Sequence, residues 1–84
     1  MLESNMKNIV KIYGEYYNLD HYKNICAGAK AGEYGDYKGK CFSSILLYLL
    51  NGDLNRCTNY EESFENGEDA TKSAQQYLST LFGE

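Results

Sequence analysis

Six consecutive apolar residues, Ile45 to Leu50, form the longest uninterrupted hydrophobic run of this 84-residue chain. On a helix, six successive residues point in every direction, so such a segment must be packed on several sides. The run is far shorter than the roughly 20 apolar residues that cross a bilayer, so we predict no membrane span. We expect it to end a central helix that starts near Asp36 and stops before Gly52, or else to meet a second molecule in part.

Apolar residues recur at intervals of three and four along most of the remaining chain, as they do in amphipathic helices. This spacing predicts helices over residues 4–17 and 18–31, and one or two short helical turns over 53–67 that stop at Asn66–Gly67. It also predicts a final helix that starts at Asp69, with Asp69 as its cap, and buries Ala70, Ala74, Tyr77, Leu78, Leu81 and Phe82.

The predicted fold is therefore all-α, a compact bundle of four or five short helices. A competing assignment applies to the first segment, because Val, Ile and Tyr favour strands and Gly14 disfavours a helix. The minor alternative is an α+β fold with a short N-terminal strand at 8–17.

Length and cysteine content predict one small domain inside the cell. Residues 1–5 are expected to be a frayed tail and residues 6–84 a single helical domain, with a thin core because a chain this short buries only about 60% of its surface. The N-terminus lacks the apolar stretch of a signal peptide. Three cysteines, an odd number, are typical of reduced thiols. We predict a cytoplasmic location.

The glycine-rich stretch 27–41 does not match a phosphate-binding loop. Gly35 and Gly39 enclose three residues instead of four, and Lys40 is followed by cysteine instead of serine or threonine. Glycines at 28, 32, 35 and 39 are better explained as turns and close packing. The same stretch could also form a loop that presents Tyr34, Tyr37, Lys38 and Lys40 to a partner.

Metal and catalytic sites are not predicted. His21, Cys26, Cys41 and Cys57 have the right number of zinc ligands, but their intervals of five, fifteen and sixteen positions do not suit a structural zinc site. A cysteine nucleophile needs a neighbouring base such as histidine to activate it, and the chain contains one histidine only. The acidic residues lack an apolar pocket that would adapt them for acid–base catalysis. We therefore expect no enzyme activity and no cofactor.

Charge is concentrated in the C-terminal third of the chain. Residues 1–56 hold six acidic and seven basic side chains, whereas residues 57–84 hold six acidic side chains and only Lys72, so +1 and −5 make up the net charge of −4. An acidic chain with a single arginine supplies few phosphate contacts, so direct nucleic-acid binding is not expected. The predicted partner-binding residues are Glu61, Glu62, Glu65, Glu68 and Asp69, together with Tyr34 and Tyr37.

These features favour a protein that binds a basic protein surface by long-range attraction and tyrosine anchors. In size, acidity and lack of catalytic residues, the chain is similar in general type to small phage or mobile-element proteins that block host defence nucleases. The likeness implies an anti-CRISPR-like inhibitor of a nucleic-acid-handling protein that occludes a basic surface. The alternative is a small structural or assembly subunit that docks on a larger complex or forms a homodimer through residues 47–50.

Overall fold

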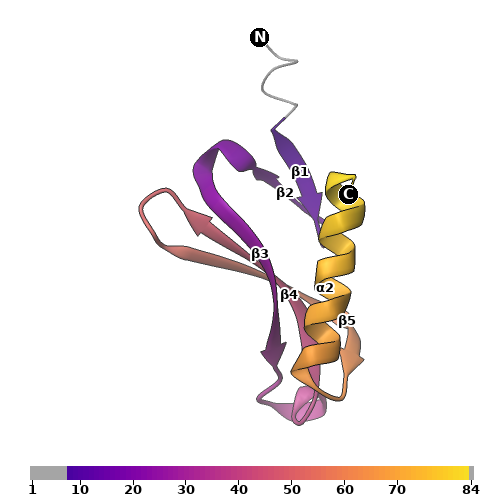
Figure 1. The fold of residues 1–84 in the computed structure, drawn as a ribbon. Coiled ribbons are helices and arrows are strands. Elements are labelled where there is room, and N and C mark those ends of the chain that lie inside the picture. The colour runs from indigo at the N-terminus through magenta and orange to yellow at the C-terminus, as the bar shows by residue number, and fades with distance from the viewer. Residues whose placement is uncertain (1–7, 84) are drawn as a thin grey trace.

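The computed structural model describes residues 8–83, which form five β-strands, one α-helix and two short 3-10 helices (Figure 1). The prediction of an all-α bundle is wrong. Half of the described residues lie in strands, and these form a two-stranded and a three-stranded antiparallel sheet. The predicted frayed tail, residues 1–5, lies outside the described residues.

Strands β1 (Ile9–Ile12) and β2 (Glu15–Asn18) form a tight hairpin where a helix over 4–17 was predicted. Its turn is Tyr13–Gly14, and both residues have positive φ angles, 48° and 91°. Two left-handed residues in a two-residue loop define a type I′ turn, whose twist suits a hairpin. Gly14 is thus a turn residue, and the alternative of a strand at 8–17 anticipated the location but not the pair of strands.

The main sheet occupies the segments predicted as the next three helices. Its strands are β3 (Tyr22–Ala31), β4 (Cys41–Leu49) and β5 (Leu54–Phe64), in the order β3-β4-β5. The 3-10 helices η1 (Leu19–His21) and η2 (Gly35–Tyr37) precede β3 and β4. The predicted helices over 18–31, 36–50 and 53–67 are therefore wrong. Gly52, expected to cap a helix, has a φ of 96° and sits in the β4–β5 turn.

The apolar run in β4 is packed on two faces of a sheet instead of around a helix. Side chains alternate along a strand, so Ile45 and Leu47 point to one face and Leu46 and Tyr48 to the other. Ile45 and Leu47 are fully buried in the core. The central strand thus buries one face of the run completely, whereas Leu46, Tyr48 and Leu49 are half-buried and Leu50, beyond β4, is 66% exposed. The expectation that the whole run is packed on several sides is met only in part.

The prediction of a C-terminal helix is confirmed by α2 (Gly67–Phe82). Its cap is Asn66 and not Asp69: the Asn66 side chain accepts a hydrogen bond from the Asp69 N–H at 2.8 Å. The pair Asn66–Gly67, predicted to end a preceding helix, therefore starts this one. Ala70 and Ala74 are fully buried as predicted, whereas Phe82 is 42% exposed.

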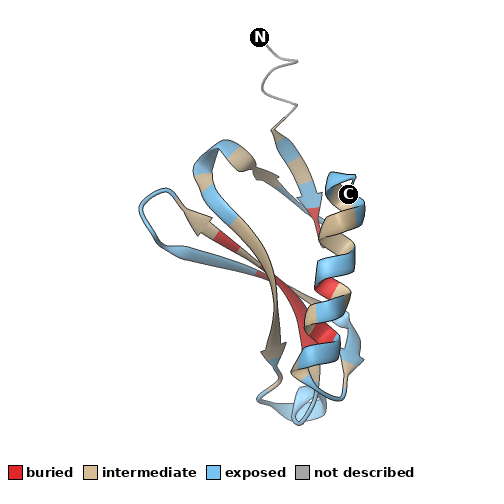
Figure 2. Ribbon diagram, viewed as in Figure 1, coloured by how far each residue is buried: buried red, intermediate tan, exposed pale blue. Residues whose placement is uncertain are grey.

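The core lies between α2 and one face of the main sheet, where the buried residues gather in Figure 2. Its buried members are Ile12, Ile45, Leu47, Cys57 and Ala74. The β1–β2 hairpin closes the core beside the C-terminal half of α2, because Tyr77 stacks on Tyr13 with 4.5 Å between ring centroids. Among residues 8–83, no helix has the length and apolar character needed to cross a membrane.

Candidate functional site: a tyrosine pocket beside acidic residues

The connection from β3 to β4 is held in a defined shape by glycines and backbone hydrogen bonds. The Gly32 N–H donates to the Lys40 carbonyl at 2.8 Å and closes the loop. A Cβ atom at Gly32 would lie 2.0 Å from the Tyr37 carbonyl oxygen, so only glycine fits there. Gly35 and Gly39 adopt positive φ angles of 56° and 83°. The prediction that glycines 32, 35 and 39 form turns agrees with this geometry, although the turns join strands.

Phe42 anchors an aromatic cluster on the face of the sheet that α2 does not cover. It is 1% exposed because Tyr37 and Tyr60 pack over it, with centroid distances of 5.3 and 5.0 Å. The rings of Tyr37 and Tyr60 are also 5.3 Å apart. Such contacts each contribute about 0.5–1.5 kcal/mol beyond area burial, so the cluster holds both tyrosines in place.

An irregularity in β5 brings Tyr60 to this cluster. Between the pairs Ser44↔Thr58 and Phe42↔Ser63, β4 advances two residues while β5 advances five. The three additional residues form a bulge, which re-aims side chains at sheet edges. The Asn59 side chain supports the bulge by accepting a hydrogen bond from the Glu61 N–H at 3.0 Å.

A pocket of about 250 Å³ opens beside the cluster, and we call it the tyrosine pocket. It is lined by Lys30, Ala31, Gly32, Glu33, Tyr34, Tyr37 and Tyr60. Tyr34 is 81% exposed, and Tyr37 and Tyr60 are about half exposed. The pocket therefore offers aromatic surface to a partner from a rigid base.

The five predicted acidic residues, here called the acidic group, are Glu61, Glu62, Glu65, Glu68 and Asp69, and all are exposed. They lie at the end of β5, in the following turn and at the start of α2. In Figure 1 this is the same end of the molecule as the η2 loop. Glu61 directly follows Tyr60 of the pocket. The structure thus brings the predicted acidic and tyrosine residues to one end of the molecule.

Two members of the acidic group also stabilise the helix. Glu68 and Asp69 lie in the first turn of α2, where negative charge is favourable. The Asp69 carboxylate also accepts a hydrogen bond from the Asn66 amide at 3.3 Å. Glu61, Glu62 and Glu65 stand outside the helix and have no such structural role.

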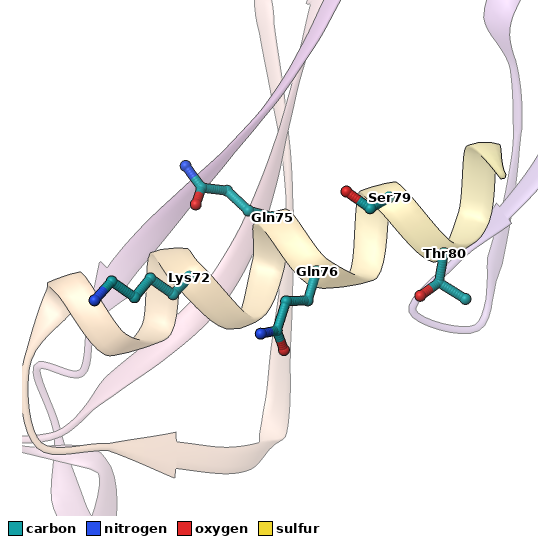
Figure 3. A pocket seen from close by; sticks show the side chains of 5 residues that line it. All are labelled: Lys72, Gln75, Gln76, Ser79 and Thr80. Atoms are coloured by element: carbon teal, nitrogen blue, oxygen red, sulfur yellow. The ribbon is translucent and has the colours of Figure 1, made fainter. Parts of the chain in front are cut away.

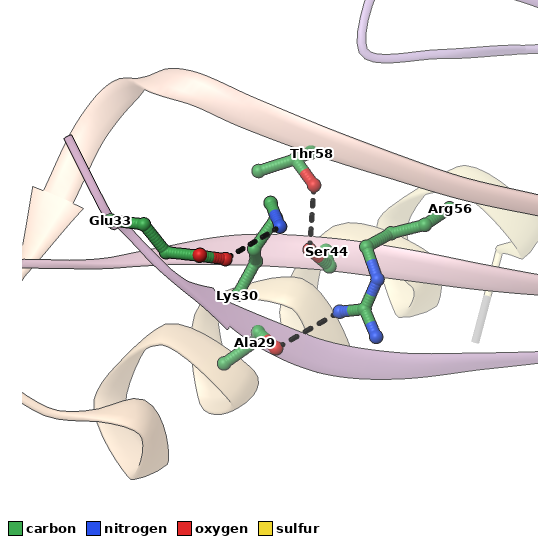
Figure 4. Close-up of polar contacts among 6 residues, drawn as sticks. All are labelled: Ala29, Lys30, Glu33, Ser44, Arg56 and Thr58. Carbon is green, nitrogen blue, oxygen red and sulfur yellow. Dashed lines mark hydrogen bonds and ion pairs between the residues drawn. The ribbon is translucent and has the colours of Figure 1, made fainter. Parts of the chain in front are cut away.

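The only ion pair among residues 8–83 joins Lys30 and Glu33 at 4.0 Å, at the edge of the tyrosine pocket (Figure 4). Figure 4 also shows Arg56, which reaches from β5 to donate to the Ala29 carbonyl at 3.1 Å, and the Ser44–Thr58 hydroxyl pair at 2.9 Å. Arg56 is therefore hydrogen-bonded within the protein, on the face of the sheet that α2 does not cover.

A second hollow runs along the solvent side of α2 (Figure 3). It is open, measures about 490 Å³ and is lined by Lys72, Gln75, Gln76, Ser79 and Thr80. Its side chains spread along the helix surface in Figure 3 and do not converge on one point. It presents hydrogen-bonding groups without an aromatic anchor, so it is a weaker candidate than the tyrosine pocket.

A small hollow of about 140 Å³ beside the β1–β2 hairpin contains Tyr17 and Cys57. The Cys57 thiol donates to the Tyr17 hydroxyl oxygen at 2.7 Å. Burial raises the pKa of the Cys57 thiol and that of the Tyr17 hydroxyl. A raised pKa disfavours the thiolate, which is the reactive form, so Cys57 is suited to packing.

The four residues weighed as zinc ligands are spread over the molecule. His21 is exposed in η1, Cys57 is buried in the core, and Cys26 and Cys41 are half-buried at separate points of the sheet. All three cysteines are free. In the described part of the chain, no group of three or more His, Cys, Asp or Glu side chains is arranged to hold a metal ion.

Sequence reasoning missed Tyr60 as a member of the site. The position of Tyr60 depends on the bulge in β5. The bulge arises from the pairing of β5 with β4, so no local sequence pattern predicts it. Comparison with protein-family models finds no matching family, and searches of curated proteins and of solved structures find no significant match.

Proposed function

We propose that this protein is a non-catalytic binding module that docks on the basic surface of a cytoplasmic nucleic-acid-handling protein and thereby inhibits it. The observation that supports this function is the juxtaposition of the tyrosine pocket and the acidic group at one end of the molecule. Exposed tyrosines offer large contact area at small entropic cost, and they are frequent at the centre of binding interfaces.

The charge at this end suits a basic partner. Glu33 and Asp36 join the acidic group, for seven carboxylates against Lys30, Lys38, Lys40 and Lys72, a net charge of −3. When carboxylates bind the lysine and arginine side chains of a nucleic-acid-binding site, they take the places of the phosphate groups of the nucleic acid and so block its binding. Complementary charge accelerates encounter, and the tyrosines then slow dissociation.

The alternative function, self-association through residues 47–50, has less support. Leu47 is fully buried in the core, so it is not available to a second copy. Leu50 is 66% exposed at the β4–β5 turn, but the residues between are half-buried. Light scattering of the free protein at micromolar concentration is expected to show a monomer.

Two triple variants with the same change in net charge test the proposed function. The docking variant carries Glu61→Gln, Glu62→Gln and Glu65→Gln, and leaves the helix-stabilising Glu68 and Asp69 intact. The control variant carries Glu15→Gln, Asp20→Asn and Asp53→Asn, which lie in β2, in η1 and beside the β4–β5 turn. Amide oxygens still accept hydrogen bonds, so both variants should fold.

Each protein is immobilised and used to capture partners from host lysate, with duplex DNA and RNA as competitors. The wild type and the control variant are expected to retain partners that nucleic acid displaces, and the docking variant is expected to lose them. Equal retention by the docking variant, or capture that nucleic acid does not affect, would contradict the proposed function.

A further inference from the structure

The tyrosine pocket has the size of one long side chain. Its volume of about 250 Å³ lies below the roughly 300–1,000 Å³ of pockets that enclose small-molecule ligands. Tyr34 is 81% exposed, while Tyr37 and Tyr60 are fixed against the buried Phe42. A side chain that projects from a partner can therefore enter between aromatic surfaces that are already in place.

The lining of the pocket holds one basic and one acidic residue, Lys30 and Glu33, and the neighbouring acidic group favours a positively charged side chain. The Glu33 carboxylate belongs to this lining, and the acidic group starts at Glu61, next to Tyr60. The faces of tyrosine rings attract cations. A guanidinium group is planar and weakly hydrated, so it stacks on such rings better than an ammonium group does. We propose that the tyrosine pocket binds one arginine side chain of the basic partner, an inference that rests on the proposed function.

Lys30 opposes this binding and so provides a sharp test. Its ammonium group lies 4.0 Å from Glu33, and its side chain is 37% exposed. An incoming guanidinium competes with the Lys30 ammonium for the Glu33 carboxylate, because the two cations repel each other. Removal of the Lys30 charge should therefore strengthen arginine binding, whereas it should weaken the binding of an anion.

The probe is N-acetyl-arginine methylamide, titrated into the isotope-labelled protein and followed by amide chemical shifts. Shifts are expected at Gly32, Glu33, Tyr34, Tyr37 and Tyr60, with saturation in the millimolar range. The citrulline analogue has nearly the same shape without the charge, and it should bind about two- to fivefold more weakly because it forms no cation–π contact. Equal binding of the two probes, or shifts located elsewhere, would overturn the assignment.

Four variants complete the test. Tyr34→Ala and Glu33→Gln should weaken the binding of the arginine probe, and Lys30→Met should strengthen it. Tyr16→Ala is the matched control, because Tyr16 is 71% exposed on β2 and its ring lies 5.6 Å from the Lys11 ammonium. If Lys30→Met weakened the binding of the arginine probe, the pocket would not be a cation site.

Failure of this inference differs from failure of the proposed function. If Tyr34→Ala and Glu33→Gln still captured the partner in full while the docking variant lost it, the protein would dock by the acidic group without an arginine in the pocket. If the docking variant also captured the partner in full, the proposed function itself would be wrong.

Discussion

At the scale of single residues, Tyr17 and Cys57 make stability depend on pH. Burial raises the pKa of both groups, so the folded protein binds their protons more tightly than the unfolded chain does. The associated stability is fully present below the unfolded values, about 8.5 for cysteine and 10 for tyrosine, and is lost as the pH rises through the raised values. The free energy of unfolding should therefore fall above about pH 9.

Tyr17→Phe should make this alkaline fall less steep. The variant removes one of the raised groups, although it also removes the acceptor of the Cys57 thiol and so lowers stability at pH 7 by about 0.5–1.5 kcal/mol. Urea unfolding at pH 7, 9 and 10.5 measures both effects. Tyr16→Phe removes an exposed hydroxyl and is expected to keep the wild-type profile. A Tyr17→Phe profile parallel to the wild type would refute the assignment.

Two glycines occupy special positions of the backbone, but the secondary structure around them was predicted wrongly. Gly14 and Gly52 both have positive φ angles, as glycines in turns often do, but Gly14 was predicted inside a helix and Gly52 just past the end of one, as its cap. An Asn–Gly pair between apolar runs is a strong hairpin signal, and Asn51–Gly52 is such a pair. Because a helix cap and a hairpin turn both need a left-handed glycine, the residue alone did not decide between them.

At the scale of elements, the contact between α2 and the β1–β2 hairpin depends on Tyr77. Its hydroxyl oxygen accepts from the Tyr13 N–H at 3.0 Å, and the hydroxyl donates to the Lys11 carbonyl at 3.2 Å. Tyr77→Phe keeps the ring stack on Tyr13 but leaves that N–H without its acceptor. We expect a loss of about 1–2 kcal/mol in the free energy of unfolding and faster amide exchange at Tyr13.

The matched control for the Tyr77 variant is again Tyr16→Phe, which should change stability by less than about 0.5 kcal/mol. Hydrogen exchange in β3 and β4 should remain slow in both variants, because the hairpin docks at the edge of the core. Unchanged stability in Tyr77→Phe would mean that apolar packing, including the ring stack, holds the hairpin to α2 without the hydrogen bonds of the hydroxyl.

The elements themselves divide into one helix that periodicity identified and five strands that the main prediction assigned to helices. In α2 the apolar positions follow a helical period, so periodicity alone predicted the helix, although Asp69 was predicted as the cap in place of Asn66. In β4 the side chains are buried on both faces, and a continuous apolar run does not distinguish a strand from a buried helix. In β3, Ala27, Ala29 and Ala31 favour helix locally, and pairing with β4 overrides that preference.

At the scale of the whole molecule, the acidic group and the tyrosines of the pocket lie close together only because of the way the chain folds. Tyr34 and Tyr37 precede β4, whereas Tyr60 and the acidic group follow it. Antiparallel pairing of β4 with β5 returns the chain to the end where η2 lies. The sequence therefore predicted the acidic group and two of the three pocket tyrosines, while their common location required the sheet topology.

This arrangement predicts how association with a basic partner depends on salt. The molecule extends 46 Å along its longest axis, whereas electrostatic attraction in solution is screened over about 10 Å at 0.1 M salt and about 3 Å at 1 M. The acidic group therefore acts locally, and salt should reduce the association rate far more than it changes dissociation. For the wild type and the control variant, we expect the association rate to fall at least about tenfold between 0.05 and 0.5 M salt.

The docking variant should associate slowly at every salt concentration and show a much flatter dependence. Its net charge equals that of the control variant, so any difference between them reports the position of the charges and not their sum. Surface-based kinetics with the captured partner measure both rates. If the two variants had the same salt dependence, steering would come from total charge, and the acidic group would have no special part in docking.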